Sequence, residues 1–130
     1  MRNLQPPSWP RPKGYSNGIE AEGRLIFVAG QVGWDEHERF VATDFAGQFE
    51  QVLRNILSVL TEANAGPEHI VRMTWYVTNR QTYLGSLKEI GAVYRALIGR
   101  NYPAMAVLVV AGLVEEGALL EIEATAVVPK

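Results

Sequence analysis

Residues 118–128 read Ala-Leu-Leu-Glu-Ile-Glu-Ala-Thr-Ala-Val-Val, and this stretch decides what kind of sheet the chain builds. Successive side chains of a strand point to opposite faces of a sheet. One face of this strand carries Leu120, Ile122, Ala124 and Ala126, and the other carries Leu119, Glu121, Glu123 and Thr125. The alternation predicts a strand with one face in the core and a mainly polar second face.

The residues just before this stretch predict two further strands with a helix between them. Residues 104–110 form a nearly continuous apolar run, which is typical of a strand buried on both faces. Residues 70–78 alternate with period two, so that Met73 and Trp75 share one face. Between these two predicted strands, apolar residues recur at helical spacing and predict one helix, closed by Gly99 and Pro103. These residues are Leu84, Leu87, Gly91, Tyr94 and Ile98.

The N-terminal half predicts an arm, a hairpin and a first helix. Residues 1–13 contain four of the seven prolines, which favours an extended arm along the surface without regular structure. Residues 16–21 and 24–29 flank Gly23 and predict a β-hairpin, whose second strand is apolar on both faces and therefore central. Thr43 or Asp44 can cap a helix with one apolar face, which Gly66-Pro67 stops.

This order of elements predicts a single α+β domain over residues 14–130. We expect a two-layer sandwich in which one mixed sheet carries two helices on one face. The other face of the sheet must then be solvated or buried in an oligomer. Because residues 104–110 are too apolar for a solvated face, we expect the chain to associate with itself.

Composition excludes several classes of function. The chain of 130 residues has no cysteine, which rules out thiol nucleophiles, disulfides and cysteine metal sites. A net charge of −2 gives no general electrostatic reason to bind nucleic acid or an anionic membrane. No apolar run approaches the roughly 18 residues that a membrane helix needs. We therefore expect a cytoplasmic protein with no membrane and no nucleic-acid partner.

Few residues are candidates for binding or catalysis, and each of them has an ordinary structural explanation. The isolated His37 and His69 lack the spacing of a metal site and fit surface or capping roles. Residues 30–33, Gly-Gln-Val-Gly, lack the lysine of phosphate loops, so they are either a strand exit or a ligand cradle. Glu121 and Glu123 should have Cβ atoms about 7 Å apart, close enough to perturb one another unless their face is solvated.

Five ordered blocks of sequence resemble the YjgF/Rid family, also known as reactive-intermediate deaminases and as L-PSP endoribonuclease-like proteins. They are Gly14-Tyr15-Ser16, residues 26–32, residues 51–57, Pro103-Ala104 and residues 121–126. The resemblance implies a chorismate-mutase-like fold and a homotrimer with clefts between subunits. It also implies hydrolysis of small imines or enamines derived from amino acids, without a metal or an organic cofactor.

The resemblance also implies roles for particular residues. Tyr15 would border the cleft, the backbone at Gly30 would contact the ligand, and Glu121 would position or activate the hydrolytic water. In the deaminase branch an arginine directly after Pro-Ala binds the carboxylate of the substrate. This chain has Met105 there, which gives the cleft an apolar floor, and its second predicted helix lacks the asparagine that the branch usually carries.

The methionine leaves three interpretations open. The substrate lacks a carboxylate, another arginine such as Arg72 or Arg100 holds it, or the protein binds a metabolite without turnover. We therefore expect a Rid-like hydrolase of small reactive imines or enamines, but not of the standard 2-imino acids. The alternative is a non-catalytic trimeric protein that binds a small metabolite. A third possibility, an endoribonuclease, requires a basic groove, for example around Arg95 and Arg100, which the overall charge does not favour.

Overall fold

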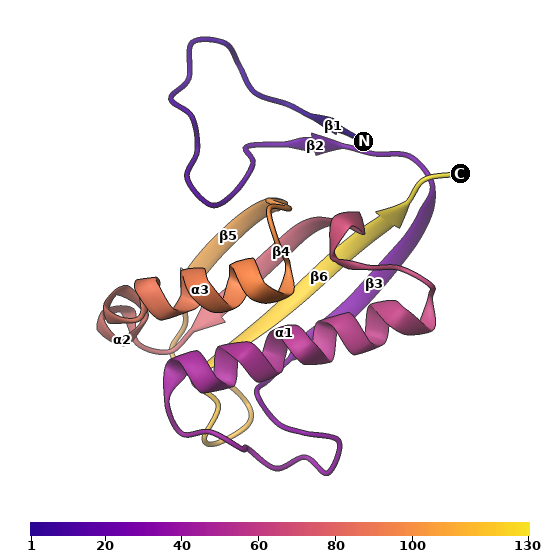
Figure 1. Cartoon of the computed structure of the whole chain (residues 1–130). Coiled ribbons are helices and arrows are strands. Elements are labelled where there is room, and N and C mark those ends of the chain that lie inside the picture. Colours follow the sequence, from indigo (N-terminus) through magenta and orange to yellow (C-terminus); the bar gives the residue numbers. More distant parts are fainter.

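The computed structural model describes residues 1–130, and its centre is a mixed sheet of four strands. The strands are β3 (Arg24–Gln31), β6 (Leu120–Val128), β4 (Ile70–Val77) and β5 (Ala104–Val109), in this order across the sheet. Strand β6 runs antiparallel to both of its neighbours, and β4 and β5 are parallel. The helices cover one face of the sheet (Figure 1). The predicted α+β class is therefore confirmed.

The alternation of residues 118–128 is also confirmed. Leu120, Ile122 and Ala126 are completely buried beneath the helices. Glu121 and Glu123 therefore lie on the opposite face, which no helix covers and which we call the open face. Their positions place two carboxylates in the middle of the sheet, beside Tyr76 of β4.

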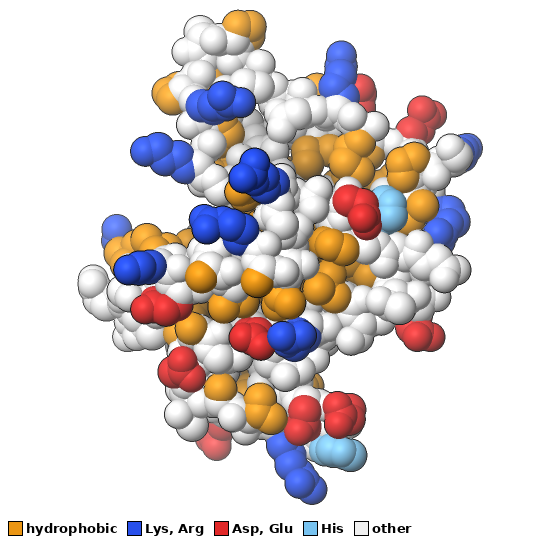
Figure 2. Space-filling model, viewed as in Figure 1, with side chains coloured by type: hydrophobic (Ala, Val, Ile, Leu, Met, Phe, Trp, Pro, Cys, Tyr) orange, Lys and Arg blue, Asp and Glu red, His pale blue; other side chains and the backbone are white.

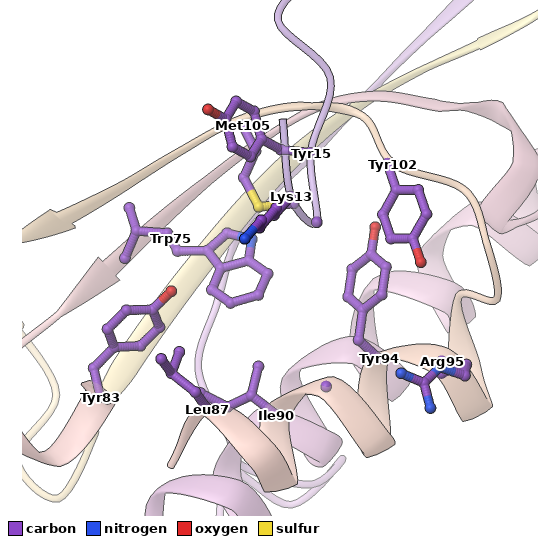
Figure 3. A pocket seen from close by; sticks show the side chains of 13 residues that line it. Lys13, Tyr15, Trp75, Tyr83, Leu87, Ile90, Tyr94, Arg95, Tyr102 and Met105 are labelled. Carbon is purple, nitrogen blue, oxygen red and sulfur yellow. The ribbon is translucent and has the colours of Figure 1, made fainter. Parts of the chain in front are cut away.

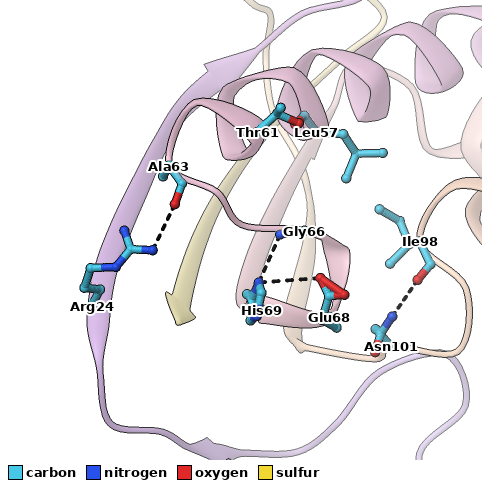
Figure 4. A network of polar contacts seen from close by, with 9 residues as sticks. All are labelled: Arg24, Leu57, Thr61, Ala63, Gly66, Glu68, His69, Ile98 and Asn101. Atoms are coloured by element: carbon cyan, nitrogen blue, oxygen red, sulfur yellow. Dashed lines mark hydrogen bonds and ion pairs between the residues drawn. The ribbon is translucent and has the colours of Figure 1, made fainter. Parts of the chain in front are cut away.

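The first helix, α1 (Phe45–Glu62), begins where the sequence predicts and ends earlier. The Asp44 side chain caps it by accepting a hydrogen bond from the Gly47 amide. The helix stops at Ala63, and Asn64 adopts a left-handed conformation with φ of 54°. Pro67 instead begins the 3-10 turn η1 (Pro67–His69). His69 Nδ1 accepts a hydrogen bond of 2.9 Å from the Gly66 amide (Figure 4), which confirms its capping role.

The second predicted helix is two helices, so the sandwich has three helices rather than two. These are α2 (Arg80–Gly85) and α3 (Leu87–Leu97), which meet at Ser86. The Ser86 hydroxyl donates to the Thr82 carbonyl at 2.7 Å, a local bond that competes with the regular helical pattern. Because the apolar spacing runs on through this break, the periodicity alone does not reveal it.

The predicted hairpin around Gly23 is wrong. The strand β2 (Ile19–Glu20) pairs instead with β1 (Arg2–Asn3), and an ion pair of 3.1 Å joins Arg2 to Glu20. These two strands form a ribbon that stands apart from the main sheet (Figure 1). The prediction that residues 1–13 contain no element is therefore wrong at β1, although the proline-rich residues 6–12 have no helix or strand.

The strand over residues 25–28 lies at an edge of the sheet, not in its centre. Its apolar residues divide between the two faces: Val28 is buried under the helices, whereas Phe27 is 74% exposed and Leu25 63% exposed. Strand β5 is the other edge and leaves Leu108 exposed. The open face is thus rimmed by apolar side chains, and self-association stays a prediction. No helix is both long enough and apolar enough to pass through a membrane.

Candidate active site

A cavity of about 560 Å³ lies between α3, the strands β4 and β5, and the chain segment at residues 13–15. Nine of its 13 lining residues are hydrophobic, so it is suited to an apolar ligand body. Its walls include Tyr15, Trp75, Tyr83, Tyr94, Tyr102 and Met105 (Figure 3).

Tyr15 and Met105 come together in this cavity, as the resemblance implies. Gly14 has φ of 80°, a conformation that favours glycine, and it turns the chain just before Tyr15. The next residue, Ser16, fixes this turn to the start of β5: its amide donates to the Pro103 carbonyl at 3.0 Å, and its hydroxyl to the Tyr102 carbonyl. Met105 pairs with the buried Met73 and faces α3.

Burial favours the neutral form of two tyrosines of the cavity, Tyr83 and Tyr94. Burial raises the pKa of the Tyr83 hydroxyl, and it raises the pKa of the Tyr94 hydroxyl further. The Tyr94 hydroxyl donates to the Asn101 carbonyl, and its ring stacks on Tyr102 at 6.0 Å between ring centres. The rings therefore form a fixed aromatic wall rather than a set of acids.

Glu121 and Gly30 come together at a second place, on the open face. A Cβ atom added to Gly30 would collide with the Glu121 carboxylate, so only glycine allows this close approach. No ion pair or hydrogen bond from the chain engages that carboxylate. The adjacent Glu123 accepts a hydrogen bond of 2.8 Å from Tyr76, and this bond raises the pKa of the Tyr76 hydroxyl.

The four predicted site residues therefore form two groups on opposite faces of the sheet. Tyr15 and Met105 line the cavity under α3, whereas Gly30 and Glu121 face the open side and do not line that cavity. The physical reason is the alternation of β6, which buries Ile122 under the helices and turns Glu121 away. One copy of the chain does not bring all four residues into one site.

The sequence did not place at this cavity the cations that line it. Arg72 lies in an open-face groove with Glu123, and Arg100 lines a separate hollow beside Asn3, so neither lines the cavity of Met105. The cations that do line it are Lys13 and Arg95. Residues 12–14 carry no pattern that could reveal this, because Lys13 reaches the cavity only through the turn at Gly14.

Neither the cavity nor the open face has a cluster of metal-ligating side chains. The structure has no group of three or more histidine, aspartate or glutamate side chains that could hold a metal ion.

The turn before α1 lies outside the cavity and the open face. Asp35 accepts hydrogen bonds there from the amides of His37 and Arg39, and these bonds lower the pKa of its carboxyl group and close the turn.

Comparison with known proteins assigns the chain to a family. Residues 9–128 match the model of the Endoribonuclease L-PSP family. A RutC family protein of Pyrococcus abyssi is 34% identical over 119 residues, which cover 90% of this chain and 89% of the relative. A RutC family protein of Aquifex aeolicus is 32% identical over 95 residues, which cover 72% of this chain and 72% of the relative.

Solved structures agree with this assignment. The Rid family protein YyfB of Yersinia pestis superposes with a TM-score of 0.86 at 32% identity and with 98% of both chains covered. RidA of an Antarctic Psychrobacter bacterium gives a TM-score of 0.70 at 26% identity, covering 98% of this chain and 100% of the other. The chorismate-mutase-like fold expected from the sequence is thus confirmed. The chain belongs to the Endoribonuclease L-PSP family, which is the YjgF/Rid family that its five sequence blocks resemble.

Proposed function

We propose that this protein hydrolyses small reactive imines or enamines and that Glu121 is its catalytic base. The observation that carries the proposal is the Glu121 carboxylate against the backbone of Gly30, with no cation or hydrogen bond from the chain engaging it. A carboxylate left free in this way can accept a proton from water. Membership of the family that includes RidA supports the same reaction class.

The reaction needs one carboxyl group that accepts and returns a proton. The oxygen of water attacks the carbon of the C=N bond, Glu121 takes a proton from that water, and the electron pair of the double bond moves to nitrogen. Glu121 then returns the proton to nitrogen. The hydroxyl proton is then transferred to the nitrogen as the C=O bond forms and the C–N bond breaks, so that ammonia leaves. No metal or organic cofactor is needed for this balance.

The complete site requires a second copy of the chain. Tyr15 and Met105 lie on one side of the sheet and Glu121 on the other, so they can act on one molecule only if another copy supplies one of the two groups. The exposed Phe27 at the rim of the open face is an apolar surface that such a copy would cover. We propose a homotrimer with three clefts between its subunits, one small-molecule substrate in each.

Met105 restricts the substrates. Methionine offers no donor for the carboxylate that the usual arginine binds, and burying an unpaired anion beside it is costly. We therefore expect small 2-imino acids, such as the one derived from alanine, to be poor substrates of the unmodified protein.

The test is ammonia release from freshly generated imines by the wild type and by Glu121→Gln. We expect Glu121→Gln to lower kcat by about 100-fold or more, the size of a typical general-base contribution. The matched control is Glu123→Gln, because glutamine can still accept the hydrogen bond from Tyr76. Equal rates for wild type and Glu121→Gln would overturn the proposal.

A second candidate function is metabolite binding without turnover. It is favoured by the absence of any carboxylate among the residues that line the cavity. Binding of a ligand to the cavity without faster ammonia release from any imine of a broad panel would select this alternative. Ammonia release that requires Glu121 would exclude it.

A further inference from the structure

The cavity contains a buried hydrogen-bond donor without a partner. Trp75 is only 4% exposed, and its indole Nε1 is the one buried side-chain nitrogen or oxygen that finds no hydrogen bond within the chain. Leaving a buried donor unpaired costs about 1 to 3 kcal/mol. Trp75 lines the cavity, so an acceptor atom of a ligand can satisfy this donor once a small shift of the indole opens the buried Nε1 to it.

A free cation lines the same cavity. Lys13 takes part in no ion pair of the chain, whose basic partners are Arg2, His37, Arg54 and His69. In Figure 3 the Lys13 side chain is directed toward the indole of Trp75. An ammonium group and an indole N–H at one cavity are two donors without a partner in the chain, and an anion can accept from both.

The charged residues that line the cavity all have the same sign. Arg95 is the other charged residue that lines it, and no aspartate or glutamate does so. Arg11 lines an adjoining hollow that shares Lys13 and Tyr15. Figure 2 shows Lys and Arg side chains gathered over the N-terminal ribbon and the neighbouring part of the molecule. This surface attracts anions toward the cavity before they make contact.

The rest of the wall is aromatic and apolar. Trp75 and Tyr94 lie 6.4 Å apart between ring centres, and Tyr94 stacks on Tyr102 with an angle of 8° between the rings. Gly91 of α3 has no atom within 4 Å of an added Cβ, so it leaves this side of the cavity open. A planar aromatic body can stack in such a space, whereas a two- or three-carbon ligand would leave it largely unfilled.

We propose that the cavity binds an aromatic carboxylate, with the carboxylate held by Lys13 Nζ and Trp75 Nε1 and the aromatic body against Tyr94 and Met105. The inference rests on the function proposed above, because it names the substrate class of the same site: the imines of aromatic amino acids, or the 2-oxo acids that they yield. Lys13 and Trp75 then replace the donor that Met105 lacks, from another side of the cavity, and a small 2-imino acid stays a poor substrate because it has no ring to fill the aromatic part.

The test measures binding of three probes by titration calorimetry. Phenylpyruvate carries both the ring and the carboxylate, its methyl ester lacks the charge, and pyruvate lacks the ring. We expect the wild type to bind phenylpyruvate at least about 10-fold more tightly than either of the others. Equal affinity for phenylpyruvate and its ester, or no measurable binding of phenylpyruvate, would overturn the inference.

Two variants assign the donors. Lys13→Gln changes an exposed side chain and should lower the affinity for phenylpyruvate about 10-fold while leaving the ester unaffected. Trp75→Phe keeps an aromatic ring but removes the N–H, and it should lower the affinity for phenylpyruvate about 3-fold to 10-fold. The matched controls, Lys88→Gln and Trp34→Phe, change residues that do not line the cavity and should bind as the wild type does. Loss of affinity in the controls equal to that in Lys13→Gln contradicts the assignment.

The outcomes separate this inference from the proposed function. Phenylpyruvate binding that depends on Lys13, without faster hydrolysis of any imine, leaves the ligand site standing and rejects the hydrolase. Hydrolysis that requires Glu121 but is unaffected by Lys13→Gln for aromatic imines supports the hydrolase and rejects the site.

Discussion

At the scale of single residues, Gly30 controls where the Glu121 carboxylate lies. An added Cβ would meet the end of the Glu121 side chain, a flexible group that can move aside, so Gly30→Ala should displace the carboxylate without unfolding the protein. A displacement of about 1 Å can cost about 100-fold in rate, and we expect a loss of that order in kcat. Gly85→Ala is the control, because its added Cβ meets no atom within 4 Å. Steady-state ammonia release checks the rates, and thermal unfolding checks that both variants are folded.

Met105 is the residue that separates small from aromatic substrates. Met105→Arg places a planar donor where the deaminase branch has one, and we expect at least a 10-fold gain in kcat/KM for the imine derived from alanine. The longer, charged side chain also intrudes on the aromatic part of the cavity, so activity on aromatic imines should fall. Both rates come from the same ammonia assay. An unchanged rate on the small imine in a folded protein would show that the surrounding geometry has diverged as well.

At the scale of elements, Gln48 of α1 joins three segments that the sequence does not connect. Its amide donates to the carbonyls of Ala42 and Gly117, at 3.1 and 2.8 Å, and its oxygen accepts from the Leu119 amide at 2.8 Å. The side chain is 1% exposed, and Gln48→Met removes the partner of all three backbone groups. We expect the free energy of unfolding to fall by about 2 to 4 kcal/mol, as measured by urea denaturation.

The control for Gln48 lies on the same helix. Arg54→Met breaks an exposed ion pair with Glu50 and should cost no more than about 0.5 kcal/mol. A loss below about 1 kcal/mol for Gln48→Met would mean that water replaces the amide at these three groups.

The elements also show what the sequence can and cannot predict. Periodicity located β4, β6 and α1, because each buries one face and repeats its apolar residues accordingly. It did not predict the break at Ser86, where the serine hydroxyl donates to the Thr82 carbonyl. It placed Arg24–Ala29 in a hairpin because Gly23 permits a turn there, whereas the partner of β3 is β6, about a hundred residues away.

The candidate site was predictable only in part, because it too depends on contacts between segments that are distant in the sequence. The family blocks identified Tyr15, Gly30, Met105 and Glu121, but not that they form two groups on opposite faces of the sheet. Lys13 and Trp75 carry no signal in the sequence, since one follows a proline-rich segment and the other alternates like any buried strand residue. Their meeting depends on how Ser16 fixes the N-terminal segment to β5, a tertiary contact.

At the scale of the whole molecule, the two groups of site residues and the exposed apolar rim have one explanation in common. A second copy packed on the open face would cover Phe27 and Leu25 and also bring a cavity wall to Glu121. We therefore expect Phe27→Lys, which places a charge at the 74% exposed position of an edge strand, to give a folded monomer that has lost imine hydrolysis. Light scattering measures the mass, and circular dichroism measures the fold. Val59→Lys is the control, since Val59 is exposed on α1 away from the open face and should leave a trimer with full activity. A wild type that is monomeric at the concentrations of the assay and still hydrolyses imines would contradict this explanation, because a single copy holds Glu121 and Met105 on different sides of its sheet.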